Sequence, residues 1–149
     1  MKQFLAGLLA ATLLSASSAS AADFAPALLY DLGGKFDKSF NEAAYNGAEK
    51  YKADSGTEYR EFEITNDAQR EQALRRFARD GANPIISVGF SQAAALEAVA
   101  KEYPDTQFAI IDAVVDAPNV QSILFKEEEG SYLVGILAAM KSETGTVGF

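Results

Sequence analysis

The sequence contains no cysteine, no histidine and no tryptophan. Without cysteine the chain forms no disulfide, and no lipid can be attached to a cysteine behind a leader peptide. The absence of histidine and cysteine also excludes Ser-His and Cys-His nucleophiles and a histidine-based zinc site. Gly33 and Gly34 match neither the phosphate-binding pattern G-x-x-x-x-G-K-[ST] nor the dinucleotide pattern G-x-G-x-x-G. We therefore expect no enzyme of these classes, no cofactor and no metal.

Positive charge is scarce: 13 Lys and Arg stand against 21 Asp and Glu, a formal net charge of −8. An acidic surface disfavours binding to nucleic acid and to an anionic membrane. Carboxylates still permit general acid and base chemistry, with the candidates Asp31, Asp37, Asp112 and Asp116. The sequence by itself brings no two of them together. A secreted carboxylate-dependent enzyme therefore remains an alternative to a non-enzymatic binding protein.

The longest apolar run lies at the amino terminus. Lys2 precedes the apolar residues Phe4–Leu14, and a small-residue stretch ends in Ala19–Ala21. This order is typical of a secretory signal peptide with an A-x-A cleavage site. The run is shorter than the roughly 20 residues that span a bilayer, so a cleaved signal (residues 1–21) is favoured over a membrane anchor. With no cysteine to carry a lipid, we expect a periplasmic, non-lipidated protein without direct membrane insertion.

The rest of the chain alternates between strand and helix signals. Strands are expected at 27–32, 59–64, 84–88, 108–111 and 121–125, and helices at 40–55, between Asn66 and Gly81, at 91–103 and at 130–141. Residues 145–149 resemble a turn that enters a further strand. The alternation predicts an α/β fold with a mostly parallel sheet and helices on both faces. In such a fold, ligands bind where the carboxyl ends of the strands meet.

Two helices have recognisable starts. Ser39 and Glu42, three residues apart, form the pattern of a capping box in front of the first helix. Asn66 is the expected cap of the second helix. Phe40 is the first apolar residue inside a capped helix, and we expect it to lie in the core.

The loop between the first strand and the first helix carries several candidate binding residues. Phe36 has charged neighbours, so it either folds back onto the core or offers a stacking surface for a flat ligand. Asn41 is either an ordinary first-turn residue or, through its amide donor and acceptor, a reader of a heteroaromatic edge. Asp31 ends the first strand and binds either nearby backbone amides or a ligand.

Two further candidates follow other strands. Asp112 ends the apolar run 108–111 and has the same two interpretations as Asp31. Gly89 follows the third strand, where it either completes a turn or lets the backbone approach a neighbour closely. All these candidates lie at the carboxyl edge of the predicted sheet.

The run DLGGKFDKSFNEAAYNGAEKY at 31–51 resembles the signature of the basic membrane protein family. These proteins are ABC-transporter substrate-binding proteins with the type I periplasmic-binding-protein fold, and characterised members bind purine nucleosides. The segments SVGFSQ at 87–92, FAIIDAV at 108–114 and EEGSYLVGILAA at 128–139 are similar to the family in kind and order. The resemblance implies that residues 22–149 form the N-terminal lobe of a two-lobe protein whose second lobe lies outside this sequence.

The resemblance also implies roles for the candidates. By motif position, Phe36 would sandwich a purine base against an aromatic of the second lobe. Asn41 and Asp112 would bond to the base, and Asp31 and Gly89 would line the same cleft. The implied partners are a purine nucleoside and an ABC permease at the inner membrane. A sugar or other small-solute binder of the same fold, and a sensor subunit, remain open alternatives.

Overall fold

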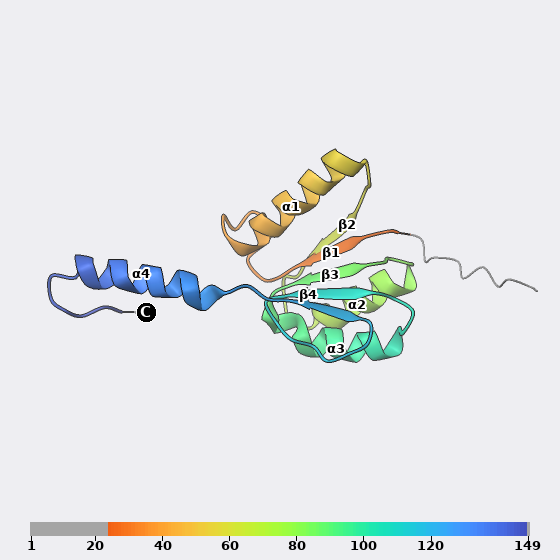
Figure 1. Ribbon diagram of the computed structural model, residues 1–149. Coiled ribbons are helices and arrows are strands. Elements are labelled where there is room, and N and C mark those ends of the chain that lie inside the picture. The colour runs from red at the N-terminus through yellow and green to blue at the C-terminus, as the bar shows by residue number, and fades with distance from the viewer. Residues whose placement is uncertain (1–23, 149) are drawn as a thin grey trace, which may run out of the picture.

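A computed structural model describes residues 24–148 of the chain (Figure 1). The predicted signal peptide, its cleavage before Ala22, and Phe149 lie outside the described residues. The core is a five-stranded sheet with the order β2-β1-β3-β4-β5, and every strand pair in it is parallel. The predicted α/β fold with a parallel sheet is therefore confirmed.

The elements follow one another in the predicted order. The strands are β1 (Ala27–Tyr30), β2 (Arg60–Glu63), β3 (Ile85–Val88), β4 (Phe108–Ile111) and β5 (Val120–Ile123). The helices are α1 (Phe40–Ser55), α2 (Gln69–Arg79), α3 (Ala93–Glu102) and α4 (Glu127–Lys141), with a 3₁₀ turn, η1 (Phe90–Gln92), before α3. The main differences are that β1 and β5 each end two residues earlier than predicted, that α3 begins two residues later, after η1, and that α4 begins three residues earlier. Residues 145–148 form no strand.

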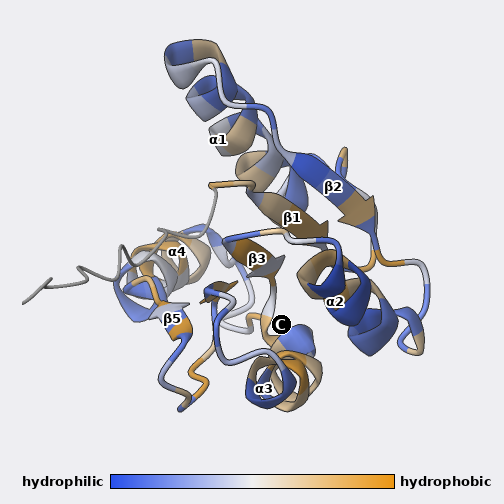
Figure 2. Cartoon of the chain, turned by 90° about the vertical axis from the view of Figure 1, so that its right-hand side faces the viewer, coloured by the Kyte–Doolittle hydropathy of each residue, from blue (hydrophilic) through white to orange (hydrophobic). Residues whose placement is uncertain are grey.

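Helices cover both faces of the sheet, as Figures 1 and 2 show. Side chains of a strand alternate between the faces. Ala27 and Leu29 of β1 accordingly join the larger apolar cluster, with residues of α2 and α3. Leu28 and Tyr30 join a smaller cluster with residues of α1. A strand buried on both faces must be apolar throughout, which explains the continuous apolar run of β1.

The start of α1 differs from its prediction. The side chain of Ser39 makes no capping hydrogen bond. The carboxylate of Asp37 caps the helix instead, accepting hydrogen bonds from the backbone N–H groups of Ser39 (2.8 Å), Asn41 (3.1 Å) and Glu42 (3.1 Å). Glu42 accepts a bond from the backbone N–H of Lys38 at 3.0 Å. The predicted capping box was wrong because a carboxylate two residues upstream reaches more amides than a serine hydroxyl.

The predicted side-chain cap of α2 was also wrong. Asn66 contributes its backbone carbonyl, which accepts a bond from the N–H of Gln69 at 3.1 Å. The residue at the cap position is Ala68, which makes no side-chain bond there. The end of α1 is as predicted: Gly56 adopts a left-handed conformation with φ 72°, and its N–H bonds to the carbonyl of Lys52 at 2.8 Å.

Helix α4 lies beyond the carboxyl ends of the strands, away from the sheet (Figure 1). None of its residues is buried. Its exposed apolar side chains are Tyr132, Leu133, Val134, Ile136, Leu137 and Met140. Within residues 24–148, no helix combines the length and apolar character needed to cross a bilayer. The part of the chain described here therefore leaves an apolar helix without packing partners.

Candidate ligand-binding edge

Three of the predicted site residues follow neighbouring strands in the sheet. Asp31 follows β1, Gly89 follows β3 and Asp112 follows β4. These strands pair in the order β1-β3-β4. Since they are parallel, their carboxyl ends meet at one edge, which is where open α/β sheets bind ligands.

The carboxylate of Asp31 joins three segments at this edge. Its Oδ1 accepts hydrogen bonds from the N–H of Leu32 at 2.8 Å and from Nη1 of Arg70 at 2.7 Å. Its Oδ2 accepts one from the hydroxyl of Ser91 at 2.5 Å. Asp31 therefore ties the end of β1 to α2 and to η1.

Burial and hydrogen bonding act in opposite directions on Asp31. Burial disfavours the charged carboxylate, but the bonds from Ser91, Arg70 and Leu32 more than offset this effect, so the pKa of Asp31 is lowered. The Arg70 side chain is only 7% exposed and also bonds to Asp67 at 2.9 Å. Its guanidinium is thus committed to two carboxylates of the protein, one of them half-buried.

Gly89 permits a close approach between its own backbone and the side chain of Asp31. Its φ is +101°, and a Cβ at this position would lie 2.7 Å from Oδ2 of Asp31. The left-handed conformation disfavours a side chain here, and the contact would force the Asp31 carboxylate to shift. Both interpretations given above apply: Gly89 lies close to Asp31, and its carbonyl accepts a hydrogen bond from the N–H of Gln92 at 3.2 Å in the turn that follows.

Asn41 lies under the loop, where it is only 1% exposed. Its Oδ1 accepts a bond from the N–H of Asp31 at 3.0 Å. Its Nδ2 donates to the carbonyls of Asp31 and Gly34, both at 3.2 Å. The amide group is therefore spent on the backbone of residues 31–34, and Asn41 shapes this loop from beneath.

Phe36 points outward from the loop and is 63% exposed. Its ring meets that of Tyr45 edge-to-face, with 5.3 Å between centroids. The ammonium of Lys35 lies 5.3 Å from the Phe36 ring centroid and pairs with Glu61 of β2. Phe36 thus stands on the side of α1 that faces β2, with one exposed surface.

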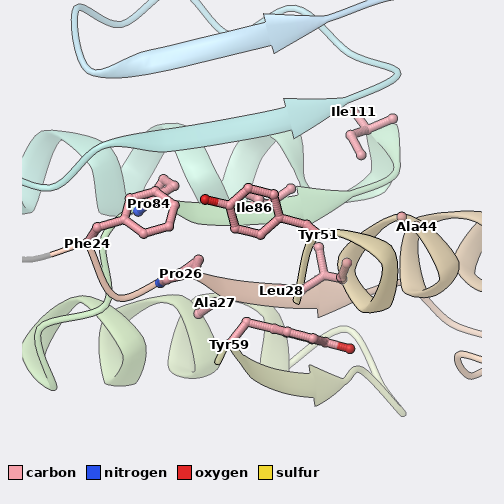
Figure 3. Close-up of a pocket in the computed structure, with 12 residues that line it drawn as sticks. Phe24, Pro26, Ala27, Leu28, Ala44, Tyr51, Tyr59, Pro84, Ile86 and Ile111 are labelled. Carbon is pink, nitrogen blue, oxygen red and sulfur yellow. The ribbon is translucent and has the colours of Figure 1, made fainter. Parts of the chain in front are cut away.

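Phe40 was expected in the core, and this expectation was wrong. The residue is 38% exposed and belongs to neither apolar cluster. The first turn of α1 extends past the end of β1, so no strand lies beneath it. Phe40 is four residues from Ala44 and so on the same helix face. Ala44 and Ile111 line a common pocket (Figure 3), which places Phe40 on the side of Asp112.

Asp112 adopts a left-handed conformation with φ 69°. Its N–H bonds to the carbonyl of Ile123 at 2.8 Å, and its side chain is half-buried. A hydrogen bond with Asp112, followed by its negative charge, raises the pKa of Glu127, the first residue of α4. The two carboxyl groups therefore lie close together at the end of β4, where hydrogen-bond donors of a ligand would be favoured.

The edge offers three exposed aromatic rings, those of Phe36, Phe40 and Phe90, together with carboxyl oxygens, which suits a flat ligand with hydrogen-bond donors. Among residues 24–148 there is no group of three or more acidic side chains placed to hold a metal ion. Asp37 and Asp31 spend their oxygens on backbone amides, Arg70 and Ser91. Asp116 is exposed.

Sequence analysis did not predict the contacts of three residues at this edge: Asp37, named there only as a candidate acid or base, caps α1, and Arg70 and Ser91 bond to Asp31. Arg70 is 39 positions from Asp31, and Ser91 is 60 positions from it. No local pattern connects residues so far apart. Asp37 could have been found, because an aspartate shortly before a helix is a common cap.

An apolar groove between α1 and the sheet is a separate feature (Figure 3). It measures about 390 Å³. Its lining is apolar and includes Phe24, Tyr51, Tyr59 and Pro84. Phe24 and Pro84 precede β1 and β3, so the groove runs toward the amino ends of the strands. It marks the part of this face that α1 leaves uncovered, and it holds none of the predicted site residues.

Comparison with known proteins gives one consistent result. Residues 26–149 match the family described as PnrA-like ABC transporter substrate-binding proteins, Bmp. A "CD4+ T-cell-stimulating antigen" of Listeria innocua is 38% identical over 91% of this chain. An "ABC transporter nucleoside-binding protein BmpA" of Lactococcus lactis is 31% identical over 85% of it. The structure of an ABC transporter solute-binding protein from Aeropyrum pernix matches 78% of the chain, with a TM-score of 0.73 and 36% identity.

The chain spans only part of these relatives. It covers 40% of the Listeria protein, 38% of the Lactococcus protein and 32% of the Aeropyrum chain. The similarity therefore concerns one portion of a longer type of protein, the portion that contains the edge described above.

Proposed function

The chain belongs to the Bmp family of PnrA-like ABC transporter substrate-binding proteins, and we propose that it supplies one wall of a purine nucleoside-binding site. The complete protein would capture the nucleoside in the periplasm and deliver it to an ABC permease. The observation that carries this proposal is the convergence of Asp31, Gly89 and Asp112 at adjacent strand ends, beside exposed aromatic rings. The nucleoside-binding name of the Lactococcus relative supports the choice of ligand class.

The five predicted residues would act in different ways. Asp112 offers a half-buried carboxylate to the amino or N–H groups of a base. Phe36 offers a stacking surface. The other three residues would position the edge and would not bond to the ligand themselves. The polar side-chain atoms of Asn41 and Asp31 already bond to other parts of the chain, and Gly89 makes room for Asp31.

Phe40 is a second candidate for the stacking ring. It is exposed, it lies on the Asp112 side of α1, and no aromatic partner is found for it in the described part of the chain. Phe36 by contrast contacts Tyr45 and Lys35. Stacking of a base on an aromatic side chain contributes about 1–3 kcal/mol, so single substitutions distinguish the two rings.

We further propose that residues 22–149 form the first lobe of a two-lobe clamp. The short coverage of the relatives supports this, as does α4, whose apolar side chains lack packing partners within the described residues. Removal of residues 1–21 and a non-lipidated product are proposed from the sequence pattern. Amino-terminal sequencing of the exported protein tests them, and an intact Met1 on membrane-bound material would exclude them.

An NMR titration of the isotope-labelled chain tests the ligand class. The ligands are adenosine, guanosine, inosine and cytidine, and NMR detects the weak binding expected when only one wall of the binding site is present. We expect purine nucleosides to bind more tightly than cytidine and to shift the amides of Gly89 and Asp112. Phe36→Ala or Phe40→Ala should weaken adenosine binding by about 1–3 kcal/mol, and the ring whose loss has no effect lies outside the site.

Asp112→Asn should weaken adenosine more than cytidine, whereas the matched control Asp116→Asn should change neither. Binding of ribose or glucose in preference to every nucleoside would instead support a sugar-binding function. Conversion of a nucleoside to its free base during the titration would support an enzyme.

A further inference from the structure

We propose that the ion pair between Lys35 and Glu61 holds the ring of Phe36 in place as a stacking surface at this edge. Lys35 and Glu61 are then positioning residues, which act through Phe36 and need no contact of their own with a ligand. This inference rests on the proposed function and deepens it, because it names the residues that fix one of the candidate stacking rings.

Strand β2 holds the loop that carries Phe36. The backbone N–H of Lys35 donates a hydrogen bond to Oε2 of Glu63 at 3.0 Å, and the Lys35 ammonium pairs with Oε1 of Glu61. Glu61 and Glu63 are two positions apart in β2, so their side chains leave the same face of the strand. Lys35 is therefore held through both its backbone and its side chain.

Glu61 is itself fixed from the core. Its Oε2 accepts a hydrogen bond at 3.1 Å from the hydroxyl of Tyr30 in β1, and Tyr30 is fully buried. The Lys35 side chain is 17% exposed and that of Glu61 is 34% exposed, so water screens this pair less than it screens a freely exposed pair. A continuous set of contacts thus runs from the core through Glu61 to Lys35.

The Lys35 ammonium lies over two aromatic rings. Its Nζ is 5.3 Å from the ring centroid of Phe36 and 5.0 Å from that of Tyr45 in α1. The two rings meet edge-to-face, with 5.3 Å between their centroids. An aromatic face attracts a cation, so Lys35 and Tyr45 together restrict the Phe36 side chain. A base then stacks on the face of Phe36 opposite to the ammonium.

The other exposed rings of the edge lack this support. Among the residues that the structure describes, neither Phe40 nor Phe90 has an aromatic partner or a cation over its ring. A side chain that is already held in place loses less rotamer freedom when a ligand binds to it. The Lys35–Glu61 pair therefore prepares Phe36 for stacking.

NMR of the ligand-free chain, isotope-labelled at its aromatic rings, tests the positioning without any ligand. We expect a nuclear Overhauser contact between the ring protons of Phe36 and Tyr45 in the wild-type chain, with the Phe36 signals identified by their loss in Phe36→Ala. Glu61→Gln removes the ion pair and keeps an amide oxygen for Tyr30, so it should weaken this contact. Lys35→Met should do the same, whereas Lys35→Arg keeps a cation and should retain the contact.

Titration with adenosine measures the consequence for binding. Glu61→Gln should weaken adenosine binding about twofold to tenfold, the range expected when one side chain must be immobilised on binding. In the Phe36→Ala background the same substitution should cause no further loss, because Glu61 acts through that ring. A purely structural role of Glu61 would cause the same loss in both backgrounds.

Glu58→Gln is the matched control. Glu58 pairs with Lys52 in the last turn of α1, at the other end of the helix from Phe36. Removal of its charge should change neither the contact between Phe36 and Tyr45 nor the affinity for adenosine. Circular dichroism checks that every variant is folded.

Three results would overturn the inference. The first is an unchanged contact between Phe36 and Tyr45 in both Glu61→Gln and Lys35→Met. The second is a loss of affinity caused by Glu61→Gln that is the same with and without Phe36, or no larger than that caused by Glu58→Gln. The third is tight binding of adenosine by Phe36→Ala, equal to that of the wild-type chain. If adenosine binds to none of the chains, the proposed function fails, and the ligand-free spectra still decide whether the pair holds the ring.

Discussion

Replacement of Arg70 by methionine should destabilise the chain strongly. Methionine keeps much of the apolar contact of the arginine stem and removes the guanidinium, so the change isolates the charge. The lost partners differ in burial: the Asp31 side chain is 21% exposed and that of Asp67 is 84% exposed. An exposed partner contributes little, so nearly all of the effect should come from Asp31.

The magnitude follows from what Asp31 retains. Removing one partner of a buried ion pair typically costs about 3–5 kcal/mol, because the other charge stays buried and unpaired. Asp31 keeps its bonds from Leu32 and Ser91 and has some access to water. We therefore expect Arg70→Met to lower the free energy of unfolding by about 2–4 kcal/mol at neutral pH.

The effect should depend on pH. The pKa of Asp31 is lowered in the folded chain. The stabilisation that its carboxylate gives the folded chain is therefore fully present above the pKa of Asp31 in the unfolded chain, about 3.9, and is lost as the pH falls through the lower pKa in the folded chain. In Arg70→Met the hydrogen bond and charge of Arg70 no longer lower the pKa of Asp31, so Asp31 takes up a proton at a higher pH than in the wild type. The stability difference between the two proteins should narrow from pH 7 to about pH 4.

Urea denaturation followed by far-UV circular dichroism at both pH values measures these differences. Arg75→Met is the matched control on the same helix, since Arg75 pairs with the exposed Glu71 and Glu102, and it should change stability little at either pH. Adding Asp31→Asn to Arg70→Met should recover part of the loss. A loss below about 1 kcal/mol, or one of equal size at both pH values, would refute the reasoning.

Three other substitutions have expected outcomes. Phe40→Ala should lower the free energy of unfolding by less than about 1.5 kcal/mol, whereas truncation of a buried phenylalanine costs about 3–5 kcal/mol. Thermal melts measure the loss, and a loss in the larger range would mean that Phe40 belongs to the core. Gly89→Ala should lower the free energy of unfolding by about 1–3 kcal/mol, because the backbone is left-handed there and the new Cβ would meet Asp31. The control Gly47→Ala in α1 should leave this free energy unchanged or raise it, and chemical denaturation measures both variants. Asp112→Asn should lower the pKa of Glu127 in an NMR titration, and an unchanged value would mean that the two carboxyl groups do not interact.

Much of the fold followed from local pattern. The apolar runs at 27–30, 85–88 and 108–111 are strands, and the glycine at position 56 ends a helix where it was expected. These features depend on residues within a few positions of one another, and the same periodicity operates in the folded chain. The errors occurred where two local signals competed, as between Ser39 and Asp37 at the start of α1.

The candidate site followed from the sequence only in part. The fold places the candidates that follow strands at one edge, because parallel strands end together. The use of each side chain was not predictable: Asn41 is buried beneath the loop, Asp31 is bound to Arg70, and Phe40 is exposed past the strand ends. Whether Asn41 and the other candidates bind a nucleoside stays a prediction.

The sequence alone determined the order of the elements, the parallel sheet, and the exclusion of histidine and cysteine chemistry, since periodicity and composition are properties of the chain itself. Only the tertiary structure decided which polar groups are already satisfied. The bond between Asp31 and Arg70 joins residues 39 positions apart, and the exposure of Phe40 depends on where α1 extends past the sheet. Such contacts arise when separate segments pack together, and no local pattern records them.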